Sequence, residues 1–277
     1  MVGERICFIS GLGAMGGALA RGLGKAALFS HGRLLGYDPL SERAQTLHAE
    51  VGLIPLEGNR QGAQQANLIL IVVKPALVTQ VLSEMSPALG PGKTVVSMAA
   101  GVPLLLLEAS LPPQVGVVRV MPNTPALVGA GAFAVSPGKS VSPEDLHFVK
   151  EMLGTMGLVV EVTEEQMDAA TALSGSGPAF VAVIIEAMAD GGVRAGLSRR
   201  VALNLSAQTV LGTAQMVLER QLHPAALKDM VASPGGTTAA GLQALEKRGL
   251  RAAALEAVVA AAQRSKEMTE QALAKKK

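Results

Sequence analysis

A glycine-rich turn between an apolar strand and a helix, close to the N-terminus, limits the fold of this sequence more than any other feature. The segment RICFIS (residues 5–10) is predicted to form a buried strand, and GLGAMG (residues 11–16) follows it directly. In the pattern G-x-G-x-x-G, the first glycine makes a tight turn, the second lets the backbone approach a pyrophosphate, and the third lets helix and strand pack closely. The helix start offers free N–H groups to phosphates. The motif alone also fits an ordinary glycine turn, but its place after the first strand favours a dinucleotide site.

Strands and helices alternate over the first 160 residues, and this alternation predicts a parallel, doubly wound sheet. Further strands are predicted at residues 33–38, 67–75, 94–101, 116–123, 131–136 and 158–162, with a helix at residues 41–50. Strands that are apolar on both faces are typical of a sheet covered by helices on two sides. After Thr163, a good helix N-cap, no convincing strand follows. The predicted fold is therefore α/β, with a Rossmann-type domain in residues 1–162 and an all-helical domain in residues 163–277.

The composition argues against several classes of protein. Of the 277 residues, 49% are hydrophobic and only 2% are aromatic, so the core is built from aliphatic side chains, methionine and alanine. The net charge of +2, without a basic patch that has interleaved aromatics, argues against nucleic-acid binding. No uncharged apolar run reaches the roughly 18–20 residues of a membrane span, and we expect no metal ion. The single cysteine, Cys7, rules out an internal disulfide and fits the reducing cytoplasm, and we expect it to be buried in the first strand.

Asp38, at the end of the second predicted strand, bears on which dinucleotide binds. An acidic residue there accepts hydrogen bonds from the adenosine ribose of NAD and repels a 2′-phosphate. Arg43 could pair with that phosphate if Asp38 turns away, and Asp38 could instead cap the next helix or join an Asp-Pro turn. We favour NADH over NADPH.

Three segments with turn chemistry follow predicted strands at the edge where such sheets bind ligands. They are VVKP (residues 72–75), SMAAGV (residues 97–102) and MPNTP (residues 121–125). The small residues Ala99, Ala100 and Gly101 would let a flat nicotinamide ring lie against the backbone. A bound nicotinamide cofactor implies hydride transfer.

Two turns rich in glycine and hydroxyl groups interrupt the helical half. They are LSGSGPAF (residues 173–180) and SPGGTT (residues 233–238), and each is predicted to open a helix. Several N–H groups at a helix start lack partners within the helix, so such a turn can bind an anion. Simple helix capping explains either turn taken alone. Two of them in a protein that binds a hydride donor indicate a small carboxylate as substrate.

The sequence has no lysine where a β-hydroxyacid dehydrogenase carries its base, and its four histidines do not convincingly replace it. In the β-hydroxyacid group a lysine follows a glycine-rich helix start by about one turn, whereas Gly177 is followed here by PAFV (residues 178–181). A substrate with a C=N bond removes this difficulty, because an imine can enter already protonated and accept hydride directly. Such chemistry needs orientation, a carboxylate clamp and a hydrogen bond to nitrogen more than a strong acid.

These segments, together with HPAALKDMVASPGGTTAAGLQALEKRG (residues 223–249), resemble the pyrroline-5-carboxylate reductase family over nearly the whole chain. The resemblance implies reduction of 1-pyrroline-5-carboxylate, a cyclic imino acid, to L-proline with NAD(P)H, the last step of proline biosynthesis. It also implies an N-terminal Rossmann domain and a helical domain that binds substrate and interlocks between subunits. We therefore expect a homodimer or a ring of dimers.

The resemblance assigns roles to individual residues. The pyrophosphate is expected to contact Ser10, Gly11, Leu12, Gly13, Ala14 and Met15. The rest of the cofactor is expected to contact Asp38, Asn59, Val72, Val73, Lys74, Pro75, Met98, Ala99 and Ala100. The substrate is expected to contact Ser174, Ser176, Ser233, Gly235, Gly236, Thr237 and Thr238, and Thr238, the expected catalytic residue, would reach the ring nitrogen.

The sequence departs from the family pattern at two positions. Some members carry Ser or Asn chemistry for a 2′-phosphate near position 38, where this chain has Asp38, which puts the use of NADP in doubt. Some carry Asn where Met230 stands, so that polar contact to the cofactor is not expected here. Two other readings stay open: a β-hydroxyacid-dehydrogenase-like oxidoreductase, which the missing lysine opposes, and a non-catalytic NAD(H)-binding sensor, which gives no reason for SPGGTT.

Overall fold

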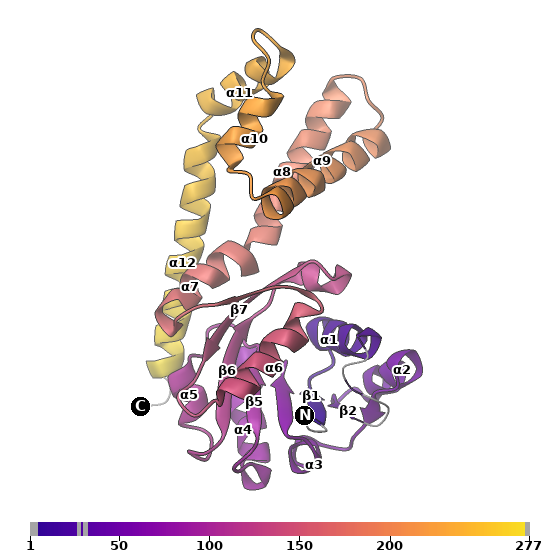
Figure 1. Cartoon of the computed structure of the whole chain (residues 1–277), viewed down its shortest axis with the longest axis vertical. Helices are drawn as coiled ribbons and strands as arrows, with labels where there is room; N and C mark the ends of the chain where they lie inside the picture. Colours follow the sequence, from indigo (N-terminus) through magenta and orange to yellow (C-terminus); the bar gives the residue numbers. More distant parts are fainter. Residues whose placement is uncertain (1–4, 27–28, 30–32, 275–277) are drawn as a thin grey trace. The chain divides into compact units, whose positions relative to one another are not determined.

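The computed structural model describes residues 5–26, 29 and 33–274. These residues form two compact units, one made of residues up to 176 together with those from 261 onward, and the other made of residues 177–260 (Figure 1). The predicted division after residue 162 separates the sheet from the helices and stays a prediction. In the grouping by contacts, residues 163–176 and the last part of the chain belong with the sheet.

Within the described residues, the first unit contains one eight-stranded sheet in the order β3-β2-β1-β4-β5-β6-β7-β8. The strands are β1 Cys7–Ser10, β2 Leu34–Tyr37, β3 Ile54–Pro55, β4 Leu68–Ile71, β5 Thr94–Ser97, β6 Gly116–Met121, β7 Gly131–Pro137 and β8 Gly157–Glu161. Strand β1 pairs in parallel with β2 on one side and with β4 on the other. The chain therefore changes the direction in which the sheet grows at β1 and β4, the point where ligands bind in folds of this class.

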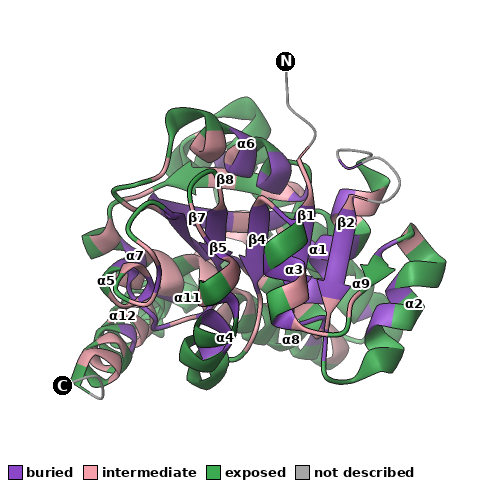
Figure 2. Cartoon of the chain, turned by 90° about the horizontal axis from the view of Figure 1, so that it is seen from below, coloured by how far each residue is buried: buried purple, intermediate pink, exposed green. Residues whose placement is uncertain are grey.

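Helices cover both faces of the sheet, so the central strands are buried on both sides, whereas the edge strands β3 and β8 are largely exposed (Figure 2). The helices of the first unit are α1 Ala14–Lys25, α2 Ser41–Val51, α3 Asn59–Gln65, α4 Val78–Met85, α5 Leu104–Glu108, α6 Pro143–Gly154 and α7 Met167–Ala170. Alternate strand residues enter two separate cores: Ile9 and Leu70 pack with α1, α2 and α6, while Phe8 and Ile69 pack with α3, α4 and α5. This alternation is the period of two expected for strands. Cys7 is fully buried in β1, as predicted.

The sheet departs from the predicted parallel arrangement at one strand pair. Strand β7 runs antiparallel to β6, and β8 is parallel to β7, so the last two strands run opposite to the other six. The short connection after β6 explains this reversal, because a parallel crossover needs a dozen or more residues and the intervening segment holds only a short 3-10 helix, η3 Thr124–Val128. The prediction also missed β3, which is two residues long and includes a proline.

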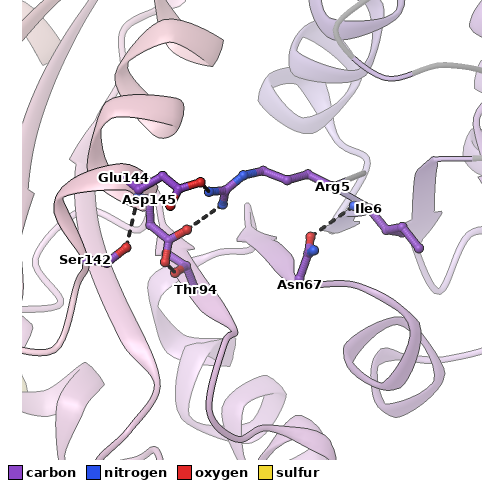
Figure 3. A network of polar contacts seen from close by, with 7 residues as sticks. All are labelled: Arg5, Ile6, Asn67, Thr94, Ser142, Glu144 and Asp145. Atoms are coloured by element: carbon purple, nitrogen blue, oxygen red, sulfur yellow. Dashed lines mark hydrogen bonds and ion pairs between the residues drawn. The ribbon is translucent and has the colours of Figure 1, made fainter. Parts of the chain in front are cut away.

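A charged network fastens the start of β1 to α6 and β5 (Figure 3). The guanidinium of Arg5 donates to the carboxylate of Asp145, which also accepts from the Thr94 hydroxyl, while Ser142 caps α6 through the Asp145 N–H. The same guanidinium lies 4.6 Å from the centre of the Phe148 ring. Partial burial alone would raise the pKa of Asp145, but the hydrogen bonds with Arg5, Thr94 and Ser142 and the charge of Arg5 hold it below its usual value. The ionised carboxylate is therefore the form that joins α6 to Arg5, before β1, and to Thr94 on β5.

A second buried ion pair links the sheet to the first turn after it. Arg119 on β6 is 3% exposed and donates to Glu164, in the 3-10 turn η4 Glu164–Gln166. The same carboxylate oxygen accepts the backbone N–H of Leu104, at the start of α5. Thr163 precedes this turn and forms a capping box with Gln166, which confirms the predicted cap. This single carboxylate thus connects β6, α5 and the start of the helical half.

The last helix, α12 Leu250–Ala274, contributes its C-terminal part to the first unit. Asp168 on α7 accepts a hydrogen bond of 2.7 Å from the Ser265 hydroxyl. A Cβ placed on Gly101, in the loop after β5, would lie 3.4 Å from the Cβ of Met268. Helix α12 therefore packs against the loop that carries the predicted nicotinamide-binding residues.

The second unit contains α8 Gly177–Arg194, α9 Arg199–Arg220, α10 Pro224–Val231, α11 Thr237–Lys247 and the first part of α12. Helices α8 and α9 form a hairpin, with Gly192 so close to α9 that an added Cβ would lie 3.0 Å from the Cβ of Ala202 (Figure 1). The side chain of His223 accepts the Ala225 N–H and caps α10.

The α8–α9 hairpin carries many exposed apolar side chains in the single chain. They include Val181, Val183, Ile184, Met188, Val201, Leu203, Leu205, Leu211, Met216 and Leu218. Two helical stretches, Glu164–Arg194 and Arg199–Arg220, are long and apolar enough to cross a membrane by length and composition alone. This measure is weak evidence, because a core helix of a soluble protein passes it as well. An apolar surface of this extent requires a covering partner.

Candidate functional site

The first unit has a cavity at the carboxyl ends of β1, β2 and β4, where the topology of the sheet predicts a ligand. Eight of the residues predicted to bind the cofactor line it: Ser10, Gly11, Gly13, Asp38, Asn59, Val72, Val73 and Lys74. The other predicted cofactor residues are not part of its lining: Leu12, Ala14, Met15, Pro75, Met98, Ala99 and Ala100. The sequence motif and the cavity therefore coincide at the end that would hold the adenosine and the phosphates.

Each of the three glycine positions in the G-x-G-x-x-G turn has its own geometric reason to lack a side chain. Gly11 has φ +92°, and an added Cβ would lie 2.7 Å from the carbonyl oxygen of Val72. An added Cβ on Gly16 would lie only 1.9 Å from the carbonyl oxygen of Gly11, so this position allows the close contact of helix and turn. Gly13 precedes α1 and has no heavy atom within 4 Å of an added Cβ. The open space at Gly13, beside the free N–H groups at the start of α1, suits a pyrophosphate.

Asp38 is buried against the glycine turn, which the sequence pattern alone did not reveal. Its Oδ2 accepts the Leu12 N–H at 2.8 Å, and its Oδ1 accepts the Leu40 N–H at 3.0 Å. Arg43 lies against both carboxylate oxygens, with its Nη1 3.3 Å from each. Both residues line the cavity. The carboxylate is thus held in place at the cavity wall, and it forms the ion pair that keeps Arg43 from being an unpaired cation there.

Asn59 connects the end of β1 to α4 through a chain of hydrogen bonds. The Ser10 hydroxyl donates to Asn59 Oδ1 at 2.7 Å, and Asn59 Nδ2 donates to Glu84 at 2.7 Å. Gln80 donates to the other carboxylate oxygen of Glu84 at 3.0 Å. Both Gln80 and Glu84 line the cavity, and neither was predicted from the sequence. Their only sequence signal is the spacing of four residues on one helix, which is common on helix surfaces.

The loop after β5 holds Met98, Ala99 and Ala100, which were predicted to face the nicotinamide. Met98 and Ala99 are buried, and the Met98 N–H donates to the Ile71 carbonyl at 2.9 Å. The loop therefore begins beside β4, whose end lines the cavity. Its role toward the nicotinamide stays a prediction.

The turn that carries Ser174 and Ser176 is a π-helix, η5 Thr171–Gly175, with Ser176 as its C-cap. The Ser174 hydroxyl donates to the Ala170 carbonyl at 2.8 Å, so toward a ligand this oxygen can act as an acceptor. A π-turn is rare and is often found at functional sites.

The turn SPGGTT begins helix α11 in the second unit. Gly235 has φ +66°, a conformation that favours glycine, and the Gly236 N–H donates to the Ser233 carbonyl at 3.1 Å. Gly236 is the N-cap and supplies no side chain, so the first N–H groups of α11 are not capped by it. Thr237 is exposed and Thr238 is half-buried. The arrangement has the free amides and hydroxyls expected of an anion-binding helix start.

Comparison with known proteins agrees with both halves of this description. Residues 5–101 match the family model described as NADP oxidoreductase coenzyme F420-dependent, and residues 164–268 match that described as pyrroline-5-carboxylate reductase dimerisation. The chain is 44% identical to the pyrroline-5-carboxylate reductase of Methanosarcina acetivorans over 97% of its own length and 99% of that protein.

The chain belongs to the pyrroline-5-carboxylate reductase family.

Solved structures of pyrroline-5-carboxylate reductases share the fold over nearly the full length. The enzyme of Coxiella burnetii is 32% identical with a TM-score of 0.92, over 96% of this chain and 99% of that one. The Plasmodium falciparum enzyme, crystallised with NADP bound, is 36% identical with a TM-score of 0.86, over 96% of this chain and 98% of that one. The predicted family and fold class are therefore confirmed, and the match to a dimerisation model supports homo-oligomerisation.

Proposed function

We propose that this chain is an NAD(P)H-dependent pyrroline-5-carboxylate reductase that reduces 1-pyrroline-5-carboxylate to L-proline, the last step of proline biosynthesis. One observation carries the proposal: a chain with a cavity lined by Gly11 and Gly13 of the glycine-rich turn is 44% identical, over 97% of its length, to a reductase of that name. The missing lysine after Gly177 opposes a β-hydroxyacid dehydrogenase. A non-catalytic sensor leaves the open helix start at SPGGTT without a purpose.

The residues of the chain divide the work of this reaction. The start of α1 and the open space at Gly13 would hold the pyrophosphate, and the bound NAD(P)H supplies the hydride. The free amides after Gly235 would hold the substrate carboxylate, and Thr238 would hydrogen-bond the ring nitrogen. Hydride adds to the imine carbon, and the electron pair of the C=N bond moves to a nitrogen that enters protonated. The protein therefore has to position and orient the reactants, and no strong acid is required.

A direct assay tests the proposal against both rivals. Oxidation of NADH is followed with pyrroline-5-carboxylate as substrate, while NAD⁺ reduction is followed with hydroxyisobutyrate-type acids. Turnover with the imino acid alone supports the proposal. Turnover with the hydroxyacid alone favours the dehydrogenase, and binding of NADH without turnover of either substrate favours the sensor.

We expect NADH to give a higher kcat/KM than NADPH, because the buried Asp38 carboxylate faces the cavity where the adenosine ribose would lie. Replacing Asp38 by serine should raise the NADPH to NADH ratio of kcat/KM at least tenfold, since it removes the repulsive charge and frees Arg43 for the 2′-phosphate. Steady-state kinetics with both cofactors measures the ratio.

The double variant Asp38→Ser with Arg43→Ala is the matched control, and it should lose most of the gain because no cation is left to pair with the phosphate. A wild-type preference for NADPH above tenfold, about 1.4 kcal/mol, would contradict the assignment. The same gain with and without Arg43 would show that the arginine has no part in it.

A homodimer, or a ring of dimers, would be built on the apolar surface of α8 and α9. That surface lies within the segment that matches the dimerisation model, and Val183 on α8 is 64% exposed in the single chain. Burial against a second copy removes such area from water at about 25 cal/mol per Å². We propose that this copy, rather than a membrane, covers the two apolar helices, and that the enzyme works in the cytoplasm.

We expect Val183→Glu to convert the oligomer to smaller species at micromolar concentration, because it places a charge on the surface that would be buried. Light scattering coupled to size-exclusion chromatography measures the mass. Val128→Glu is the control, since Val128 is exposed on η3 outside the matched segment, and it should leave the mass unchanged. A wild-type chain that is a stable monomer would contradict the prediction.

A further inference from the structure

The π-turn at Thr171–Gly175 solves a problem that Pro178 creates. In a continuous α-helix the Ser174 carbonyl would accept the N–H of residue 178, but proline has no N–H and its ring clashes with that carbonyl. The chain instead widens by one residue, and the Ser176 N–H donates to the Thr171 carbonyl, five residues back, at 3.0 Å. This arrangement leaves the Ser174 carbonyl in need of a donor from elsewhere, because an unpaired carbonyl in a half-buried turn is unfavourable.

Asn123, at the end of β6, supplies that donor. Its Nδ2 donates to the Ser174 carbonyl at 3.1 Å, and its Oδ1 accepts the Ala132 N–H, at the start of β7, at 2.8 Å. Only one orientation of the amide satisfies both partners, since one of them is an acceptor and the other a donor. Both ends of the side chain are therefore used within the protein.

The end of β6 touches the same turn at a second point. A Cβ placed on Gly175 would lie 2.5 Å from the Cε of Met121, so the methionine side chain packs directly on the backbone of the turn. Met121 and Asn123 thus brace Gly175 and Ser174 from one strand end. Strand β6 is paired on both sides within the sheet, and contacts at two adjacent residues of the turn fix its orientation as well as its position.

We propose that Asn123 is a positioning residue for the reaction: it donates the hydrogen bond that Pro178 cannot, and so holds Ser174 and Ser176 in place toward the substrate. The inference rests on the proposed function, because the substrate is the group that these serines would face. Asn123 acts through the turn and does not itself touch the substrate. If Ser174 and Ser176 moved by a fraction of an ångström, binding of a small imino acid would be weakened, while the cavity beside the glycine-rich turn would stay intact.

The decisive experiment removes the donor at residue 123 and supplies a replacement donor to the Ser174 carbonyl from residue 178. Asn123→Asp keeps an oxygen for the Ala132 N–H but loses the donor to the Ser174 carbonyl. Pro178→Ala places an N–H where a helix would supply one to the same carbonyl. We expect Asn123→Asp to raise the KM for pyrroline-5-carboxylate about tenfold in the chain that has Pro178, and less than threefold in the Pro178→Ala background. The dissociation constant for NADH, measured by fluorescence, should stay within twofold throughout.

Asn123→Ala is carried through the same cycle, in case the charge of the aspartate disturbs folding, and NADH binding reports which variants are folded. The inference would be overturned if the Asn123 substitution raised KM by the same factor with Pro178 and with Pro178→Ala. It would also be overturned by an unchanged KM with a lowered Tm, which is the mark of a purely structural bond. Absence of turnover in the wild-type chain would reject the proposed function and this inference with it. Wild-type turnover with equal factors would reject the inference alone.

Discussion

Gly16→Ala is expected to destabilise the protein by about 2–3 kcal/mol, because the added methyl group would lie 1.9 Å from the carbonyl oxygen of Gly11. Both groups are backbone or directly attached to it, so neither can move aside without separating α1 from β1. A loss of this size lowers Tm by roughly 4–12 °C. The same movement would displace the start of α1 from the cavity, so NADH binding should be weakened as well. Thermal unfolding and NADH titration measure the two effects.

Gly13→Ala is the matched control from the same motif. It meets no heavy atom within 4 Å and has φ −66°, which alanine adopts freely, so Tm should change by less than about 2 °C. Its methyl group would project toward the cavity where the pyrophosphate is proposed to lie, so the affinity for NADH should fall about tenfold or more, which is about 1.4 kcal/mol. Unchanged affinity in Gly13→Ala would place the pyrophosphate elsewhere. A Gly16→Ala variant as stable as the wild type would show that the helix has room to move.

The strands of the sheet show what the sequence can and cannot predict of the fold. The pattern of apolar segments predicted seven of the strands, because each is a short apolar run bounded by turn residues. It did not predict that β7 runs antiparallel to β6. The direction of a strand leaves no mark in its own residues and depends on the length of its connection. Ile54–Pro55 has too few residues to show any period.

The site could be predicted where backbone geometry imposes a residue type. The glycine turn and SPGGTT are such cases, because a positive φ or a close backbone approach leaves little choice. The hydrogen-bond partners of the side chains could not be predicted from the sequence. Asn59 bonds Ser10 and Glu84, and Asn123 bonds Ser174, across 25 to 51 positions of the sequence. Nothing local to an asparagine tells which distant backbone group it will satisfy, so these contacts follow from the folded sheet alone.

The surface that a second copy would cover was visible in the sequence for a different reason. Residues 180–188 are apolar on too many sides for the surface of a monomer, and in the single chain Val181, Val183, Ile184 and Met188 are indeed exposed. Which residues of the partner they would meet depends on the symmetry of the assembly, and a local pattern carries no information on symmetry.

Thr238 provides the sharpest test of the substrate end. It is the second residue of α11, and the N-cap is Gly236, so the threonine does not cap this helix. The amides exposed after Gly235 would meet the carboxylate, and a side chain one residue beyond Thr237 can reach the adjacent ring nitrogen. A hydroxyl group suits that position because it both donates and accepts, and the nitrogen changes from an iminium in the substrate to an amine in the product.

Thr238→Val is expected to lower kcat/KM for pyrroline-5-carboxylate roughly 5- to 150-fold, the equivalent of about 1–3 kcal/mol for one hydrogen bond to a polar group left unpaired. Valine keeps the shape and has a similar helix propensity, so Tm and NADH affinity should hardly change. Thr237→Val is the control within the same turn: Thr237 is exposed and acts through its backbone amide, so its variant should keep nearly full activity. Steady-state kinetics beside melting curves separates the two roles. Full activity in a destabilised Thr238→Val variant would mean that the hydroxyl group supports the helix and takes no part in the reaction.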